Sequence, residues 1–151
     1  MVGVSGRSGW GKIVIPSSAD TTKGNAVRYT LLLHYPEATA DSVGADAIEE
    51  GGRAFTSYAR TLEQAGVLIS AEVLQPSVSS TTVTVSDGSM RVQDGPFADS
   101  KEQLGGTFVI DVADLDSALD WAGKAPAVQW GTVEVRPGAV YFADGVWTPN
   151  T

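Results

Sequence analysis

The order of the apolar segments constrains this chain more than any other feature of its sequence. After residue 26, short β-type runs and two segments of helical periodicity follow one another as strand, helix, strand, strand, helix, strand, with one hairpin inserted. This order is the split βαβ arrangement of a ferredoxin-like fold, an antiparallel sheet with both helices on one face. We therefore predict one α+β domain over residues 27–138, with an N-terminal extension over 1–26 and a tail over 139–151.

The first half of this domain has clear boundaries. Residues 29–35 form a nearly continuous apolar run, which is typical of a buried strand. Over residues 43–65, apolar side chains recur at spacings of three, four and seven, which predicts an amphipathic helix. Asp41 or Ser42 can cap the start of this helix, and Gly66 can end it.

A hairpin separates the next two predicted strands. Residues 67–74 form the strand before it, and residues 107–112 form the strand after it. The hairpin itself consists of residues 81–85 and 90–93, joined through Asp87-Gly88. A tight turn fits this dipeptide because glycine adopts positive φ without steric cost.

The end of the chain contains a second helix and one or two further strands. Asp114 or Asp116 can cap the helix. Residues 133–136 alternate apolar and charged side chains, as a half-exposed strand does. Residues 140–142 and Trp147 predict either a last strand or a strap over the surface.

Residues 1–26 differ in composition from the rest of the chain. They are rich in Gly, Ser and Thr, and we favour a flexible leader for this segment. The alternative is one edge strand, because Trp10 and residues 12–15 supply apolar side chains.

Charge and cysteine content exclude several function classes. The net charge is −8 and the pI about 4.4, so the chain repels nucleic acid and anionic lipid, and we expect neither as a partner. Without cysteine it has no disulfide framework, thiolate zinc site or cysteine nucleophile, which is compatible with the cytoplasm. No apolar run approaches the roughly 18 residues that a membrane helix needs. We expect a cytoplasmic protein without a cofactor or a metal site.

The predicted sheet leaves its second face without helices. In a domain of this size, packing two sheets face to face is an economical way to cover that face. The architecture therefore predicts a homodimer.

A long motif in the middle of the chain points to a known family. Residues 94–97 read Asp-Gly-Pro-Phe, and residues 101–106 read Lys-Glu-Gln-Leu-Gly-Gly. This motif resembles the signature of the DGPF branch of the YCII-related family. Leu74-Gln75-Pro76 is similar to the segment that precedes the family's hairpin, and the resemblance extends over residues 28–137.

The resemblance implies a dimeric α+β barrel but little about activity. Most members of this branch have no known reaction, and some are associated with alternative sigma factors by gene neighbourhood. The wider family includes a dehydrochlorinase-type lyase and proteins proposed to use a His–Asp pair, with the histidine on the first helix. The predicted first helix here contains no histidine and reads Ala-Phe-Thr at residues 54–56. This departure weighs against the family's proposed chemistry.

His34, the one histidine of the chain, is the candidate for acid–base chemistry. It lies at the end of the first predicted strand, and imidazole is the side chain that changes charge between pH 5 and 8. A carboxylate such as Asp94 or Glu102 would fix its tautomer. The alternative, which we favour, is a histidine at a strand edge that binds a backbone carbonyl or water.

The turn at residues 94–97 has a structural and a functional interpretation. In the structural one, Asp94 and Pro96 set the turn and Phe97 anchors the loop in a core. In the functional one, the loop rims a ligand pocket at the dimer interface. Asp94 and Glu102 would then be its polar groups, with Pro96 and Phe97 beside the ligand.

Four other features are best explained by structure. Gly105-Gly106 lies between a turn and a strand, and we expect the backbone geometry there to require glycine. Lys101 is expected to form an ion pair with a nearby acid at the surface. Glu134 and Arg136 share one strand face and predict a salt bridge or a contact across the dimer. The acids over residues 111–116 favour helix capping over a calcium or magnesium site.

Three functions remain open at this point. The first is a domain that binds a small molecule. We rank it first because the fold commonly forms pockets and no nucleophile or metal-binding cluster stands out in the sequence. The second is an acid–base enzyme, of lyase or isomerase type, that uses His34 with Asp94 or Glu102. The third is a protein-interaction module linked to transcription regulation.

Overall fold

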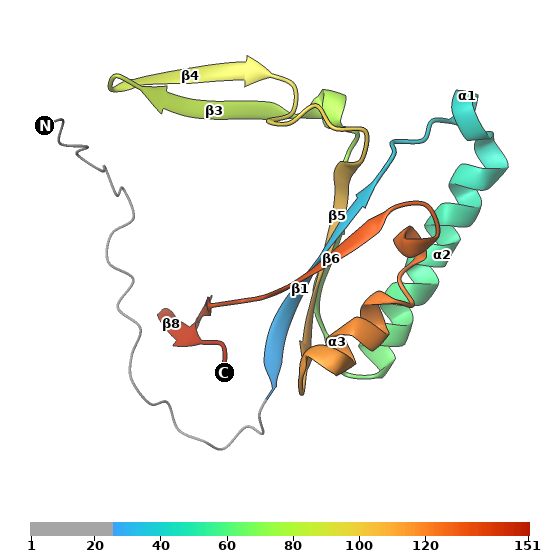
Figure 1. Cartoon of the computed structure of the whole chain (residues 1–151), viewed down its shortest axis with the longest axis vertical. Helices are drawn as coiled ribbons and strands as arrows, with labels where there is room; N and C mark the ends of the chain where they lie inside the picture. Colours follow the sequence, from blue (N-terminus) through green and yellow to red (C-terminus); the bar gives the residue numbers. More distant parts are fainter. Residues whose placement is uncertain (1–25) are drawn as a thin grey trace, which may run out of the picture.

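The computed structural model describes residues 26–151, which form a sheet with helices on one face and two hairpins that project from it (Figure 1). The elements, in chain order, are β1 (Val27–Tyr35), α1 (Ala40–Val43), α2 (Ala45–Gln64), β2 (Leu68–Val73), η1 (Ser77–Ser79), β3 (Thr81–Ser86), β4 (Ser89–Asp94), β5 (Gln103–Val112), α3 (Leu115–Ala122), η2 (Pro126–Gln129), β6 (Thr132–Pro137), β7 (Val140–Ala143) and β8 (Val146–Pro149).

The central sheet has four strands in the order β2-β5-β1-β6, and all neighbours are antiparallel. This is the strand order of a split βαβ fold, so the predicted α+β class and ferredoxin-like topology are confirmed. The predicted leader and its alternative edge strand lie outside the described residues. None of the described helices is long and apolar enough to cross a membrane.

The segment predicted as one helix over residues 43–65 is two helices. Thr39 caps α1 in a capping box with Ser42, so the prediction of Asp41 or Ser42 as the cap is wrong. The break falls at Gly44, where φ is +89°, and α2 begins at the next residue. Gly66, with φ at +72°, follows the end of α2 as predicted.

One face of the sheet packs against α2 and α3 and forms the core. Its largest fully buried side chains come from β1, β5 and α2, and they are Leu31, Leu33, Leu62, Phe108 and Ile110. Tyr58 of α2 is 6% exposed and donates a hydrogen bond to the Trp121 carbonyl of α3 at 2.8 Å. This bond joins the two helices above the sheet.

The other face of the sheet carries the alternate side chains. We call it the open face and define it by Thr30, Leu32, His34, Thr107 and Val109, all of which are half-buried. Strand pairing requires this alternation, because successive residues of a strand point to opposite faces.

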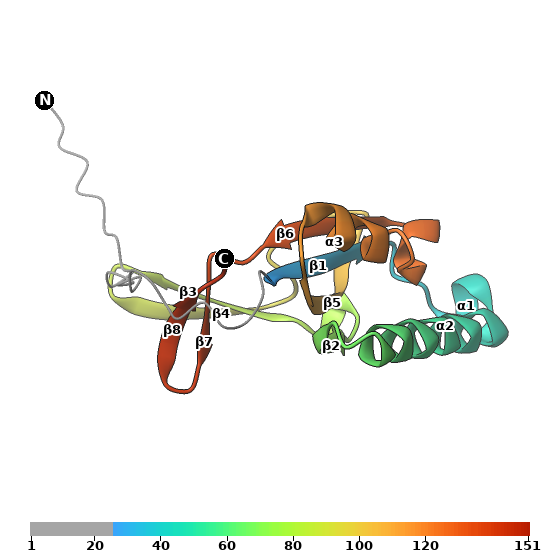
Figure 2. The same cartoon turned by 90° about the horizontal axis from the view of Figure 1, so that it is seen from below.

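Two hairpins extend on the side of the sheet away from the helices (Figures 1 and 2). In β3–β4, Asp87 and Gly88 both have positive φ, at 50° and 75°, which confirms the predicted turn. The tail forms the second hairpin, β7–β8, and thus contains two strands. Asn150 ties this hairpin to β1, because its side chain accepts a hydrogen bond from the Arg28 amide at 2.7 Å and donates one to the Arg28 carbonyl at 2.8 Å.

Candidate functional site

An open groove lies where β1, β5 and β6 meet at one end of the sheet. Its volume is about 740 Å³, and it is lined by His34, Pro36, Ser100, Lys101, Glu102, Trp130, Thr132 and Glu134. Two of the predicted site residues, His34 and Glu102, therefore lie in one groove. His34, Thr132 and Glu134 belong to the open face, since His34 pairs with Thr132 and Leu32 with Glu134.

Close backbone approaches hold His34 in this position. A Cβ atom on Gly131 would lie 2.1 Å from the His34 carbonyl oxygen, so only glycine lets the chain cross the end of β1 there. On the other side, the register between β1 and β5 shifts at His34 and skips Gly105. A Cβ on Gly105 would lie 2.1 Å from the Tyr35 ring. The Gly-Gly pair of the motif thus serves backbone geometry, as predicted.

Tyr35, the residue after His34, links β1 to β5. Its hydroxyl donates a hydrogen bond to the Gly105 carbonyl at 3.1 Å. Burial, and to a smaller extent the negative charge of Glu37, raises the pKa of Tyr35. The neutral phenol therefore stays a hydrogen-bond donor over the physiological range, and it fixes β1 against β5 beside His34.

Glu134 is the carboxylate nearest to His34. Its Oε2 lies 3.8 Å from His34 Nε2, and the two side chains are 42% and 32% exposed. The other oxygen, Oε1, accepts hydrogen bonds from Nε of Arg136, at 2.9 Å, and from Nη2. The predicted Glu134–Arg136 salt bridge is confirmed, and it directs the free oxygen of Glu134 toward the imidazole.

Glu102 lines the same groove and contacts Thr132, the β6 residue that pairs with His34. Its Oε2 accepts a hydrogen bond from the Thr132 hydroxyl at 3.3 Å. The loop before β5 is braced by the Gln103 amide, which donates to the Ala98 and Ser100 carbonyls at 2.9 and 3.1 Å. Glu102 and Glu134 thus contribute two carboxylates to the groove that contains the one imidazole of the chain.

Trp130 supplies an apolar wall that the sequence did not reveal. It is 44% exposed and packs edge-on against Phe55 of α2, with ring centroids 6.3 Å apart. Its position before Gly131 is the one available signal, because a glycine beside a strand start often marks a close backbone approach.

The turn over residues 94–97 lies outside the lining of the groove. Asp94 ends β4 opposite Thr81 and is exposed, and the structure does not bring it together with His34 in this groove. Gly95 has φ at +102°, as the turn interpretation requires, and Pro96 is half-buried. Phe97 is 95% exposed. The prediction that Phe97 anchors the loop in the core of its own protomer is therefore wrong; its place beside a ligand at a dimer interface stays a prediction.

Asp114 has the capping role that the sequence predicted. Its Oδ1 accepts a hydrogen bond from the Ser117 amide at 2.8 Å at the start of α3. Hydrogen bonds from the amide and the hydroxyl of Ser117 lower the pKa of the Asp114 carboxyl. Among the described residues, no group of three or more His, Asp or Glu side chains is arranged to hold a metal ion.

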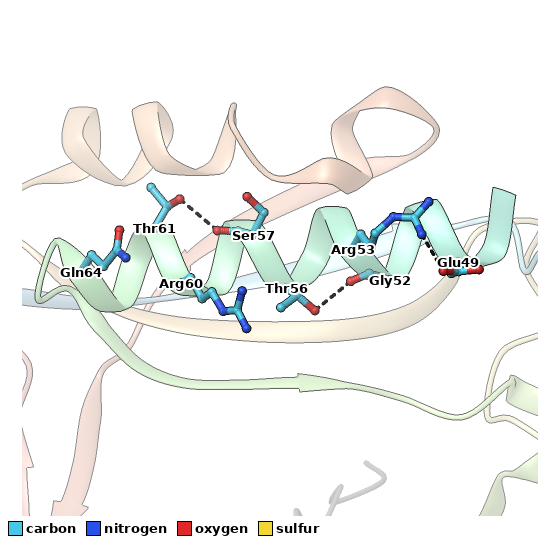
Figure 3. Close-up of a pocket in the computed structure, with 8 residues that line it drawn as sticks. All are labelled: Glu49, Gly52, Arg53, Thr56, Ser57, Arg60, Thr61 and Gln64. Atoms are coloured by element: carbon cyan, nitrogen blue, oxygen red, sulfur yellow. Dashed lines mark hydrogen bonds and ion pairs between the residues drawn. The ribbon is translucent and has the colours of Figure 1, made fainter. Parts of the chain in front are cut away.

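A second groove follows the outer side of α2 (Figure 3). It is lined by the polar side of a single helix, including Glu49, Arg53 and Arg60. Arg53 pairs with Glu49 one turn away, and the Thr56 hydroxyl donates to the Gly52 carbonyl at 2.9 Å (Figure 3). All the lining residues belong to α2, so this surface brings no separate elements together.

Comparison with known proteins identifies the domain. The sequence profile of the YCII-related domain matches residues 27–138. An uncharacterized protein from Rhizobium meliloti (strain 1021) is 36% identical over 115 residues, which cover 75% of this chain and 93% of that protein. The motif over residues 94–106 and the observed strand order agree with this match. The chain belongs to the YCII-related family.

Proposed function

We propose that this YCII-related domain binds a small organic molecule in the groove around His34. The observation that carries this proposal is the 3.8 Å approach of Glu134 to His34 in a groove walled by Trp130 and Glu102. An aromatic wall with a few converging polar groups is the usual composition of a small-molecule site.

The groove favours a ligand with a flat apolar part and a cationic or hydrogen-bond-donating end. Trp130 offers its partly exposed ring to the flat part. Glu102 and Glu134 offer oxygen atoms to donors, and the net charge of −8 attracts cations. Lys101, at the exposed rim, is the one Lys or Arg side chain among the lining residues.

A homodimer belongs to the same proposal. None of the helices in the described part of the chain lies over the open face of the sheet, and two such faces can cover each other. His34, Thr132 and Glu134 lie at the end of this face, so the groove would stand at the rim of the dimer interface. A cytoplasmic location is also proposed, and the absence of cysteine supports it.

The ligand class can be tested with three matched compounds, benzylamine, benzyl alcohol and benzoate. His34 is the only histidine, so its ring gives a single set of imidazole NMR signals to follow in a titration. Benzylamine should bind roughly three to ten times more tightly than benzyl alcohol, and benzoate should bind worst, because partly exposed charge pairs contribute up to about 1 kcal/mol each.

Two variants sharpen this experiment. Glu134→Gln should reduce the preference for benzylamine, whereas Glu49→Gln on the outer side of α2 should leave it unchanged. Equal or better binding of benzoate would contradict the cationic ligand class. If none of the three compounds moved the His34 signals, the groove would not be a site for such molecules.

A second candidate is an acid–base enzyme, and the His34–Glu134 geometry favours it. A carboxylate 3.8 Å from one ring nitrogen can orient the imidazole for proton transfer. Glu102 lies in the same groove, whereas Asp94 does not line it. For any compound that the protein turns over, His34→Gln should lower kcat about 10²- to 10⁴-fold, and full retained turnover would exclude this role.

A further inference from the structure

The β3–β4 hairpin, which we call the arm, presents one apolar and one polar side. Val83 pairs with Val92 and Val85 with Met90, so these four side chains share one side, which we call the arm face. They are 60%, 55%, 72% and 69% exposed, respectively. The opposite side carries the alternate residues Thr82, Thr84, Arg91 and Gln93.

The base of the arm is anchored, but within residues 26–151 the arm face is not covered by other elements. At the base, the Gly95 amide donates to the Ser80 carbonyl at 2.8 Å, and the Ser77 hydroxyl donates to Glu37 at 2.8 Å. Beyond this point the two strands pair with each other and project away from the domain (Figures 1 and 2). An isolated two-stranded hairpin is at best marginally stable in water, so an exposed apolar arm face indicates a surface that becomes covered.

We propose that the arm face packs against a second copy of this chain, at the edge of the open face, so that the two copies exchange arms. This inference rests on the homodimer proposed above and adds to it which segment clasps the partner. The arm projects on the side of the sheet away from the helices, which is the side of the open face (Figure 1). A second copy that packs on the open face would therefore lie beside the arm.

A second copy suits this surface for two reasons. In a two-fold dimer each copy supplies one arm and one open face, so the arm face and the open face of both copies are used in one closed assembly. A stable interface also buries about 800 Å² per partner, more than four side chains supply. The arm face is therefore sufficient only as an extension of a larger contact, and the half-buried Leu32 and Val109 provide the start of one.

Arm exchange would also affect the groove. Phe97 lies between the arm and the groove-lining residues 100–102 along the chain, and it is 95% exposed in the protomer. A partner that orders the arm would cover Phe97 and fix the loop on which Lys101 and Glu102 stand. The groove is thus completed by the dimer.

The decisive test compares substitutions on the two sides of the arm in the full chain. Val83→Asp combined with Val85→Asp places charges on the arm face, and Thr82→Asp combined with Thr84→Asp places them on the polar side of the same strand. Sedimentation equilibrium should give the wild type twice the 15.7 kDa protomer mass. The first variant should dimerise at least roughly 100-fold more weakly and the second within about threefold of wild type, as burying two unpaired charges is costly. Circular dichroism checks that both variants fold.

The outcomes separate this inference from the proposed homodimer. A monomeric wild type would overturn both arm exchange and the homodimer. The arm would then be covered by another part of the chain or by a different protein. A dimer that survives the Val83 and Val85 substitutions would overturn arm exchange and leave the homodimer standing.

A cross-linking experiment tests the contact directly. The chain has no cysteine, so single cysteines are unique. Protein carrying Met90→Cys, mixed with protein carrying Thr30→Cys and treated with a short bismaleimide, should form a cross-linked heterodimer. Replacing the arm cysteine by Gln93→Cys, on the polar side, should reduce its yield several-fold. Equal yields from both arm positions would overturn the assigned orientation.

Discussion

The two faces of the central sheet are built from the same strands and have opposite characters. Toward the helices, Leu31 and Ile110 are completely buried, and Phe108 is 1% exposed. Toward the open face, Thr30 and Val109 from the same strands are only half-buried, and their neighbours on this face include the paired Arg28 and Asp111 at one end and His34 and Glu134 at the other. Buried apolar packing is therefore concentrated on one face, and the partly exposed polar side chains, including those of the proposed site, lie on the other.

The largest expected effect is on the free energy of unfolding, and it differs between two neighbouring residues of β5 that point to opposite faces. Phe108→Ala should destabilise the protein by about 3–5 kcal/mol, because it leaves a cavity in the core. Val109→Ala should cost less than about 1.5 kcal/mol in the isolated protomer. Urea denaturation of dilute protein measures both values. Equal losses would show that the open face is already a core within one protomer.

The next effect concerns Gly131, where the chain crosses the end of β1 beside His34. Gly131→Ala should cost roughly 1–3 kcal/mol, since its methyl group must displace the His34 carbonyl, 2.1 Å away. The His34 ring signals should shift in the same variant. As a control, Gly52→Ala introduces a methyl group into open space on α2 and should stabilise that helix by up to about 1 kcal/mol. An unperturbed Gly131→Ala protein would contradict the close approach.

A smaller effect appears at alkaline pH on the helix side. Burial raises the pKa of Tyr58 from 10.0 to about 12. The folded state therefore keeps the neutral phenol more readily than the unfolded state, and this contribution is present below pH 10 and is lost as the pH rises toward 12. After solvent screening it should amount to about 1–2 kcal/mol. Tyr58→Phe should remove it, and urea denaturation between pH 9 and pH 12 measures the difference; an unchanged slope would exclude Tyr58 as its source.

The smallest effect on stability is expected on the open face. Arg136→Ala removes the partner of Glu134, but both side chains are largely exposed, so the loss should stay below about 0.5 kcal/mol. The His34 ring signals should nevertheless move, because Arg136 no longer holds Oε2 of Glu134 toward the imidazole. If Arg136→Ala lowered the stability clearly and left the His34 signals unchanged, the salt bridge would stabilise the fold and would not orient Glu134 toward His34.

The sequence predicted the fold in detail because its signals are local. Alternation of side chains, the Asp87-Gly88 turn and the glycine after α2 each act within a few residues. The site required pairings that no local pattern contains. Glu134 reaches His34 only because β6 lies beside β1 in one register, across 100 residues of chain. The role of Gly131 likewise depends on which strand end the chain crosses.

Phe97 illustrates a different limit of sequence reasoning. A large aromatic residue in a turn is ordinarily assigned to the nearest core, since aromatic side chains bury much apolar area. In this protomer Phe97 is 95% exposed and does not belong to the core cluster around Phe108. Apolar character therefore does not by itself place a side chain in the core of its own protomer.

Asn150 has a consequence for how this chain can be cut and rejoined. By binding both backbone groups of Arg28, it holds the last residues against the beginning of β1. The domain over residues 26–151 is thus nearly a closed loop, and its backbone could be rejoined there and opened at Asp87-Gly88 without crossing the core. Such a circular permutant would keep the central sheet and divide only the arm, so it would convert the two arm strands into chain termini.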